Sequence, residues 1–368
     1  MRHLTRAVSW SLVLTGLLVV TILASASIGS VDIHPIDVAK AILNTLSVPA
    51  GVSITLNGGS YLGADLLPVS PSFDLHWRSL FDFGVTDSHQ RIVVNIRLPR
   101  VMLAAIVGFG LAAAGTVMQG FFRNPLADPA IIGVSSGAAV GAVLAITAPM
   151  LLPFGLQPAA FIGGIAAAVL VYAIATEDGR TPVATLLLAG IAIQTFLGAV
   201  ISYLLLHSGD SMRQVVYWLM GHLHASTWSE VAFAAPVTAI LFIGLAFYTR
   251  DLNVLLLGEE DAHHLGVAVE RTKRILLALS SAITAAGVAV SGVIGFVGLV
   301  VPHMLRLIVG PDHRILLPTA ALGGASFLVM ADTIARMGAA EAPVGIVTAA
   351  IGAPFFLYLL MRRRVYAL

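Results

Sequence analysis

Apolar residues follow one another in long runs along this chain, and short polar segments separate the runs. Because a helix rises about 1.5 Å per residue, about 20 apolar residues cross the roughly 30 Å hydrocarbon core of a membrane. Ten runs reach or approach this length, at residues 7–28, 98–120, 131–152, 158–176, 183–206, 231–249, 273–294, 296–309, 315–335 and 343–361. The pattern predicts an all-α, polytopic membrane protein with about ten transmembrane helices in a single domain, residues 1–368.

Two of these runs have unusual features. The eighth is short, and Gly292, Gly295 and Gly298 lie around it, which predicts a broken or tightly packed crossing. The first follows Arg2 and Arg6 and has the basic start and small end residues of a signal peptide. Since it is also long enough to span and nine apolar runs follow it, we interpret it as a retained helix.

Composition agrees with the membrane assignment. Hydrophobic residues make up 58% of the chain and charged residues 11%, so most of the chain could dissolve in water only by exposing apolar surface. A net charge of +1 with dispersed arginines argues against a nucleic-acid partner. With no cysteine, the chain has no disulfide, thiolate metal site or thiol nucleophile.

The distribution of basic residues predicts the orientation. Lys and Arg collect in short cytoplasmic loops, and an N-terminus inside the cell places most of the 20 basic residues there. An even number of spans then returns the Arg-rich C-terminus to the same side. Both termini are therefore predicted to be cytoplasmic, in a multi-pass protein of the cytoplasmic membrane.

Residues 29–90 form a predicted external segment. Apolar positions at helical spacing predict a short amphipathic surface helix over residues 35–46, with Ile36 and Leu43 on its apolar face. Residues 47–89 are rich in Gly, Pro and Ser and predict a loop. Its aromatic residues either anchor in the membrane interface or pack on the outer mouth, and they are Tyr61, Phe73, Trp77, Phe81 and Phe83. A second external surface helix is predicted over residues 211–223, with Met212 and Val215 on its apolar face.

Three arginines lie at the outer ends of predicted spans, namely Arg97, Arg100 and Arg336. A guanidinium group can bind a carboxylate through two parallel hydrogen bonds, so these residues could hold a docked partner. Alternatively, they extend to lipid headgroups or cap helix ends. Helical spacing also predicts local pairing of Asp332 with Arg336, and of His303 with Arg306.

The inner loop between the second and third spans contains Asn124 and Leu126. Pro125 and Pro129 restrict its backbone and stop a helix from running through it, which predicts a stiff turn. Such a turn suits a gate, and a plain helix connection is the alternative. Glycines at 133, 137 and 141 have the spacing that lets helices pack closely in lipid.

The chain carries no predicted ATP site or catalytic residue. A phosphate-binding loop needs Gly-Lys-Ser or Gly-Lys-Thr, but the two lysines, Lys40 and Lys273, follow alanine and threonine. The predicted spans are also poor in acids and bases, which argues against an ion-coupled carrier. His263 and His264 lie among acidic residues, and we interpret them as a solvated surface and predict no metal site. Energy is therefore expected from a separate ATPase subunit.

Several motifs together carry a resemblance to a known family. In chain order they are residues 97–100 (RLPR), 123–129 (RNPLADP), 133–138, 217–221, 251–266, 295–303 (GFVGLVVPH), 312–314, 331–336, 341–345 and 351–354. This series resembles the permeases of binding-protein-dependent ABC importers for vitamin B12, haem and ferric siderophores, and it covers nearly the whole chain.

The resemblance implies a type II ABC importer permease fold. It implies a second copy of the chain, two ATPase subunits that use ATP and Mg, an external substrate-binding protein, and no cofactor on this chain. Arg97, Arg100 and Arg336 would dock the binding protein, and Asn124 and Leu126 would narrow the inner end of the passage. A second half of that gate would lie near residues 182–185, where Val183 and Ala184 depart from some relatives.

The resemblance also assigns residues 250–272 to a cytoplasmic segment that couples to the ATPase as two short helices. The residues assigned to coupling are Leu252, Leu256, Leu257, Gly258, Glu259, Leu265 and Gly266. The predicted cargo is cobalamin, because the arginine triplet and the loop at 124–127 closely match vitamin B12 permeases. A ferric siderophore or haem is the alternative cargo, and a gradient-driven carrier is the alternative class.

Overall fold

The computed structural model describes residues 2–57, 70–338 and 341–361. Within these ranges, seven helices are long and apolar enough to cross a membrane, and three apolar helices are shorter. The long helices are α1 (Arg2–Ser27), α4 (Leu98–Phe121), α6 (Leu156–Ala175), α7 (Val183–Leu206), α9 (Trp228–Phe247), α12 (Val269–Ser291) and α14 (His313–Arg336). The shorter ones are α5 (Val134–Thr147), α13 (Val297–Val309) and α15 (Val344–Met361). Each predicted span corresponds to one of these helices, so the predicted all-α membrane fold is confirmed.

Local backbone constraints explain why α5 and α13 are short. A 3-10 turn, η2 (Pro129–Ile132), precedes α5, and Gly133 then adopts a left-handed φ of 82° that only glycine enters without strain. Before α13, the chain leaves α12 at Gly292 with φ 68° and stays irregular up to Phe296. The predicted break around these glycines is therefore present.

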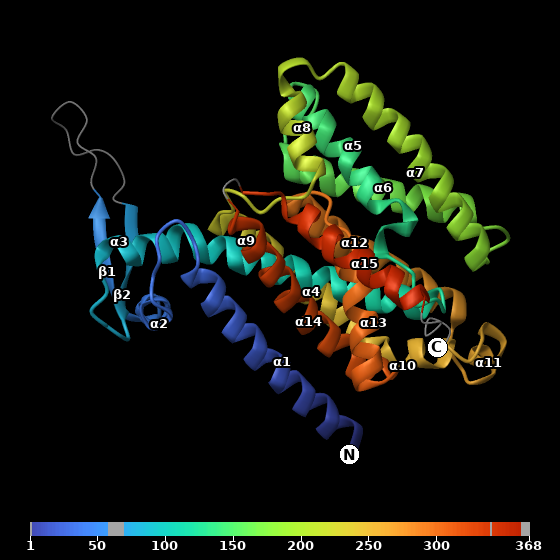
Figure 1. Ribbon diagram of the computed structural model, residues 1–368, viewed down its shortest axis with the longest axis horizontal. Coiled ribbons are helices and arrows are strands. Elements are labelled where there is room, and N and C mark those ends of the chain that lie inside the picture. The colour runs from blue at the N-terminus through green and yellow to red at the C-terminus, as the bar shows by residue number, and fades with distance from the viewer. Residues whose placement is uncertain (1, 58–69, 339–340, 362–368) are drawn as a thin grey trace.

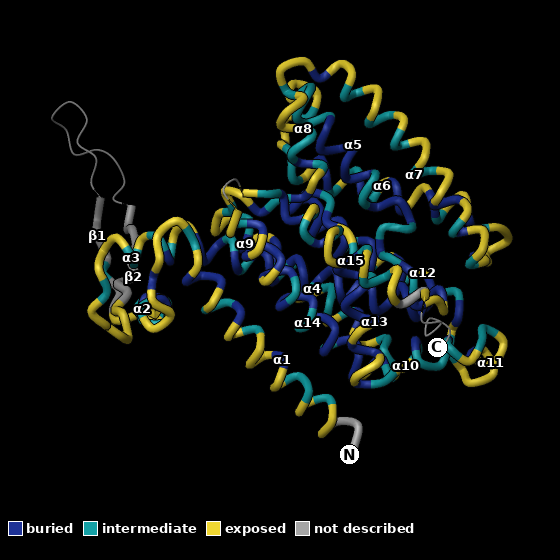
Figure 2. Tube along the Cα trace, viewed as in Figure 1, coloured by how far each residue is buried: buried dark blue, intermediate teal, exposed yellow. Residues whose placement is uncertain are grey.

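The core of the bundle consists of α4, α12, α13 and α14, which are largely buried in Figure 2. Glycines allow the close contacts: a Cβ on Gly108 would lie 2.3 Å from the Gly324 carbonyl oxygen, and a Cβ on Gly137 would lie 2.3 Å from that of Gly163. Close packing at Gly137 and Gly141, between α5 and α6, matches the prediction, whereas Gly133 serves the turn. In α1 and α7, only 6% and 17% of the apolar window is buried, so these helices leave most of their surface for lipid or another chain.

The external segment departs from the predicted loop. Strands β1 (Ser47–Asn57) and β2 (Ser70–Ser79) form an antiparallel hairpin, with Ser47 opposite Ser79. The strand signal was present in Val52, Ile54 and Leu56 at alternate positions, but Pro49 and Gly51 obscured it, and the register shifts at that point. Of the predicted aromatic set, the Phe81 and Phe83 rings stack at 5.5 Å between centroids after the hairpin. Tyr61 lies outside the described residues.

Both predicted surface helices are present, as α2 (Pro35–Asn44) and α8 (Met212–Leu219), but α2 buries a different face from the predicted one and α8 buries only part of the predicted face. In α2, Val38 and Ala41 are buried and Ile36 is exposed. In α8, Trp218 is buried beside Val215, and Met212 is exposed. The helical spacing was correct, and the neighbouring elements determined which face packs.

Two short helices lie far from the hairpin, α10 (Thr249–Leu255) and α11 (Glu259–His264) (Figure 1). The start of α1 and the end of α15 lie on this same side of the bundle. Following the predicted orientation, we call the hairpin side the outer end and the α10–α11 side the inner end.

Candidate functional site

Two of the outer arginines, Arg97 and Arg100, lie on a helix that begins earlier than predicted. Helix α3 (Asp87–Arg91) and a π-helical turn, η1 (Ile92–Arg97), continue directly into α4. The Leu98 N–H bonds to the Val93 carbonyl oxygen, five residues back, and Pro99 follows. A proline has no N–H and its ring crowds the carbonyl four residues before it, so a widened turn at this point relieves the clash. This turn orients Arg97 and Arg100.

Arg97 is turned toward the end of α1. One of its terminal nitrogens donates to the carbonyl oxygens of Ala26 at 2.7 Å and Ser27 at 2.9 Å, and the other donates to that of Val31. The last carbonyls of a helix have no partner within the helix, so the guanidinium caps α1. Gly29 leaves room for this contact, because a Cβ there would lie 2.6 Å from Nη2 of Arg97. Arg97 is therefore buried, and its contacts correspond to the helix-capping alternative.

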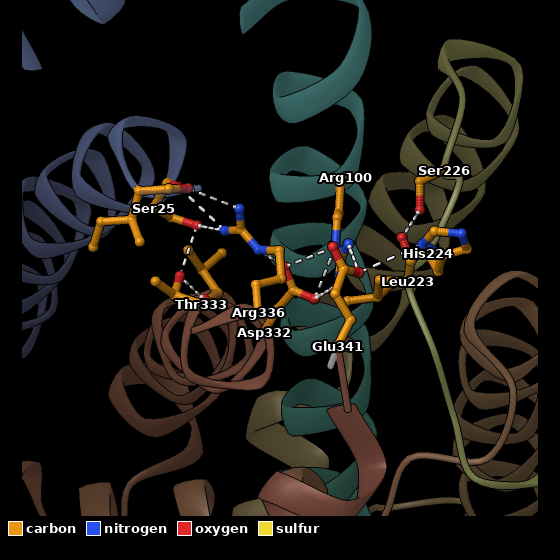
Figure 3. Close-up of polar contacts among 11 residues, drawn as sticks. Ser25, Arg100, Leu223, His224, Ser226, Asp332, Thr333, Arg336 and Glu341 are labelled. Atoms are coloured by element: carbon orange, nitrogen blue, oxygen red, sulfur yellow. Dashed lines mark hydrogen bonds and ion pairs between the residues drawn. The ribbon is translucent and has the colours of Figure 1, made fainter. Parts of the chain in front are cut away.

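Arg100 and Arg336 share one buried carboxylate (Figure 3). Nε and Nη2 of Arg100 donate to Oδ1 of Asp332 at 3.1 and 3.0 Å, while Nε of Arg336 donates to Oδ2 at 3.1 Å. The Asp332 side chain is 1% exposed. Arg336 also donates to the hydroxyl of Ser25 at 2.7 Å, which ties α14 to the end of α1. The predicted Asp332–Arg336 pair is confirmed, but no local pattern indicates that Arg100, 232 residues away, binds the same carboxylate.

Glu341 completes the cluster from the loop after α14. Nη1 of Arg100 donates to Oε2 of Glu341 at 2.7 Å, and Nδ1 of His224 lies 3.5 Å from the same oxygen. Burial opposes the charged carboxylate, but the hydrogen bond from Arg100 and the charges of Arg100 and His224 outweigh it and lower the pKa of Glu341. The Glu341 side chain is 45% exposed, so this carboxylate faces both the cluster and the solvent.

All three predicted docking arginines line one hollow at the outer end, with a volume of about 540 Å³. Ile28, Met337 and Glu341 also line it. We call Arg97, Arg100, Asp332, Arg336 and Glu341 the outer cluster. The structure thus brings together arginines that were predicted separately from two spans.

A second hollow of about 730 Å³ adjoins the cluster and shares Glu341. Arg213, Tyr217, His222 and His224 line it. Burial, with the nearby charges of His224 and Arg100, lowers the pKa of His222, so its imidazole is neutral at pH 7. His207 lies apart, with Nδ1 2.9 Å from the Tyr203 carbonyl oxygen.

The predicted pairing of His303 with Arg306 is wrong. Both side chains are buried in α13, and neither makes a hydrogen bond to any residue that the structure describes. The spacing of three residues was correct, but it did not bring the guanidinium N–H groups of Arg306 into hydrogen-bonding geometry with a ring nitrogen of His303.

The inner loop forms the predicted stiff turn. Oδ1 of Asn124 accepts from the Leu126 N–H at 3.0 Å, and Oδ1 of Asp128 accepts from the Ala130 N–H at 2.8 Å. These contacts fix the loop from within, as Asx turns do. Burial raises the pKa of Asp128. Asn124 is exposed at the inner end and Leu126 is half-buried.

The two short helices α10 and α11 lie where the resemblance implies them, joined by a turn at Leu256, Leu257 and Gly258, which has φ 132°. Leu257 is 63% exposed and Leu265, next to Gly266, is 61% exposed. Leu252 is buried at 1%, near Gly120 of α4. Of the residues assigned to coupling, Leu252 therefore anchors the segment, while Leu257 and Leu265 face outward.

Asn253 fixes α10 to the start of α14. Its Nδ2 donates to Oδ1 of Asp312 at 2.7 Å, and its Oδ1 accepts from the His313 N–H at 2.9 Å. Asn253 is not among the predicted site residues, because an asparagine in a short helix gives no signal of a partner 59 residues away. In the described part of the chain, no group of three or more His, Asp or Glu residues could hold a metal ion.

Comparison with known proteins places these features in a family. A family model described as the FecCD transport family matches residues 17–362. A cobalamin import system permease protein, BtuC, of Halobacterium salinarum is 56% identical, covering 99% of this chain and 98% of that protein. A hemin transport system permease protein, HmuU, of Yersinia pestis is 46% identical, covering 80% of this chain and 90% of that protein.

The fold agrees as well. A solved structure of a metal-chelate type ABC transporter, in an inward-facing conformation, superposes with a TM-score of 0.77 at 31% identity, covering 96% of this chain and 98% of that chain.

Proposed function

The chain belongs to the FecCD transport family of ABC importer permeases, and from this premise we propose that it carries cobalamin across the cytoplasmic membrane. Two copies would enclose the passage, two ATPase subunits would bind at the inner end, and a substrate-binding protein would deliver cargo at the outer end. Both termini would then be cytoplasmic.

One observation carries the choice of cobalamin. The match to the cobalamin permease of Halobacterium salinarum spans 99% of this chain and so includes the external segment at 29–90. The hemin permease matches 80% of the chain at lower identity. Haem and ferric siderophores remain the competing cargoes, and the uptake experiment below separates them.

The outer cluster supports docking of an acidic partner. The cluster contains three arginines and two carboxylates, Asp332 and Glu341, so its own residues carry one excess positive charge beside a hollow of about 540 Å³. Arg100 is the central residue, because its Nη1 binds the half-exposed Glu341 and a partner's carboxylate could take that place. Arg97 and Arg336 flank it in the same hollow.

The inner end supports binding of an ATPase. Leu257 and Leu265 are large apolar side chains exposed beyond the apolar bundle, and Glu259 lies between them in sequence. Exposed apolar side chains beside a charged rim are typical of a protein–protein interface. Nucleotide-driven movement of this segment would open or close the turn that carries Asn124 and Leu126, provided that nucleotide binding favours one state over the other.

Uptake into proteoliposomes tests the proposal. The permease would be reconstituted with its ATPase subunits and binding protein, and accumulation of radiolabelled cobalamin, haem and ferric citrate would be measured with and without ATP. We expect ATP-dependent accumulation of cobalamin only. Accumulation of haem or ferric citrate instead would reject the cargo, and accumulation without ATP or the ATPase would reject the importer mechanism.

A substitution at Arg100 tests docking separately. Arg100→Ala should weaken binding of the cobalamin-binding protein by roughly tenfold or more, since a charged pair at an interface contributes at least about 1.4 kcal/mol. Arg91→Ala is the matched control, because Arg91 is exposed on α3 at the same end of the molecule. Surface plasmon resonance on nanodisc-embedded permease gives both affinities, and equal affinities for the two variants would contradict the assignment.

A further inference from the structure

Lys273 is a buried lysine near the inner end of α12. Its side chain is 5% exposed, although an isolated ammonium group in such a place costs several kcal/mol. Lysine is among the residues least often buried, and it is buried when it is paired. The hydrogen-bond partners of Lys273 therefore indicate the structural role of this charge.

Those partners come from three different elements. Nζ donates to Oε1 of Glu259 in α11 at 3.1 Å, to Oε1 of Glu270 in α12 at 3.0 Å, and to the carbonyl oxygen of Thr181 at 2.6 Å. Oε2 of Glu270 in turn accepts from the Thr181 N–H at 3.1 Å. Thr181 is thus held through both of its backbone groups, two residues before α7 begins at Val183. We call Lys273, Glu259, Glu270 and Thr181 the inner junction.

The contacts of α7 link Thr181 of the inner junction to η2. The Leu186 N–H bonds to the Pro182 carbonyl oxygen, so the held segment leads directly into the first turn of the helix. One turn further, α7 packs tightly on η2: a Cβ on Gly190 would lie 2.3 Å from the Ile131 carbonyl oxygen, and Nε2 of Gln194 donates to that oxygen at 2.6 Å. Since η2 directly follows the turn at 124–128, a shift of α7 would move that turn.

On the other side, α11 is attached to the bundle through the core packing of Ala262 and through this junction. Ala262 is its buried residue, and within the described part of the chain Glu259 makes the side-chain hydrogen bond from α11 to another element. A lysine suits such a joint, because its ammonium has three donors on a flexible four-carbon stem and can keep its contacts while the helices tilt.

We propose that Lys273 is a positioning residue that makes α11 and the start of α7 move as one body. Movement of the ATPase-facing segment would then reach the turn with Asn124 and Leu126 through Thr181, α7 and η2. This inference rests on the proposed importer function, and it adds a specific residue and route that the exposed coupling positions do not supply.

Paired spin labels test whether the two elements move together. The chain has no cysteine, so His264→Cys in α11 and Thr185→Cys in α7, both exposed, can be labelled alone. In the complex with the ATPase subunits, diluted with unlabelled chain, the distance between the labels should stay narrow and unchanged between nucleotide states. In Lys273→Gln it should broaden or change with nucleotide. A distance that changes with nucleotide in the unsubstituted complex, or one that Lys273→Gln leaves narrow, would overturn the proposal.

The ratio of transport to hydrolysis gives a second, independent readout. Lys273→Gln should lower the cobalamin moved per ATP hydrolysed by roughly tenfold or more, the factor expected when about 1.4 kcal/mol of coupling is lost. Glu177→Gln is the matched control, because Glu177 is an exposed carboxylate on the loop before Thr181, outside both the junction and the segment at 250–272, and its ratio should equal that of the unsubstituted chain. A normal ratio in Lys273→Gln would overturn the proposal.

A third variant guards against misfolding. Glu259→Gln leaves the contacts of Lys273 with Glu270 and Thr181 in place, so it removes only the charge of the α11 contact. It should give an intermediate loss in both measurements, and behaviour like that of Glu177→Gln would overturn the proposal. If unsubstituted chain moved no cobalamin with ATP, the proposed function would fail, while the label distances would still report whether α11 and α7 are joined.

Discussion

The outer cluster and the inner junction both combine basic and acidic side chains, but they differ in which charge is in excess. The partly exposed carboxylate of the outer cluster is Glu341 at 45%, and those of the inner junction are Glu259 at 41% and Glu270 at 30%. The outer cluster combines three arginines with two carboxylates and so keeps one positive charge, whereas the inner junction combines one lysine with two carboxylates and keeps one negative charge. The outer cluster could therefore attract an acidic group of a partner, and the inner junction a basic one.

The chemistry of the cations also differs between the two regions. Arginine forks hold fixed, planar contacts, and here two of them share Asp332, so the outer cluster is a rigid network of charges. The single lysine of the inner junction makes three contacts from a flexible stem, two of them to carboxylates that reach solvent. We infer that the outer end is built to be recognised and the inner end to transmit movement.

The largest expected effect tests the rigidity of the outer cluster. Asp332→Asn leaves two buried guanidinium groups without their shared charge and should lower the free energy of unfolding by about 3–5 kcal/mol. Asp37→Asn is the control, since Asp37 forms an exposed pair with Lys40 at 3.4 Å and its loss should cost about 0.5 kcal/mol or less. Denaturant unfolding in detergent measures both, and similar costs would show that the outer cluster is not a buried charge network.

A smaller stability effect is expected at the inner junction. Lys273→Gln removes the charge, but Glu259 and Glu270 can be hydrated where they are, at 41% and 30% exposure. The free energy of unfolding should therefore fall by about 1–2 kcal/mol, less than for Asp332→Asn. The same unfolding measurement compares them, and a larger loss at Lys273 would reverse the contrast between a rigid outer cluster and an adaptable inner junction.

The smallest effect concerns the exposed carboxylate of the outer cluster and its dependence on pH. Because the folded state lowers the pKa of Glu341 below its ordinary 4.5, its ion pair stabilises the fold above that pH and is lost as pH falls through the lowered value. The unsubstituted chain should be more stable than Glu341→Gln by less than about 1 kcal/mol at pH 7, since solvent screens the pair. Melting curves from pH 7 to 3 should show this difference vanish in acid, and a difference that grew in acid would contradict the sign.

Much of the architecture could be predicted from local sequence. Membrane-length apolar runs predicted each crossing, because the apolar core of a bilayer imposes length and composition on every span separately. Gly292 and its neighbours predicted the broken crossing, and Asp332 with Arg336 predicted a pair within one helix. The hairpin at 47–79 was missed, because a proline and a bulge interrupted a short alternating pattern.

The site was only partly predictable, for a related reason. The docking arginines could be chosen one by one, but Glu341, His224 and Asn253 acquire their roles from residues far away in the chain. For Arg97, the position at the end of a predicted span suggested docking of a partner, but in the structure the side chain caps α1.

By itself, the sequence determined the positions of the apolar helices, the membrane environment, the absence of thiol chemistry and the membership of a transport family, since each depends on composition or on motifs read in order. Only the tertiary structure decided which charges meet. Asp332 joins two arginines from different helices, and Lys273 joins α11 to the segment before α7. The physical reason is that a buried charge must find its counter-charge in space, and packing of the helices determines which residues can supply it.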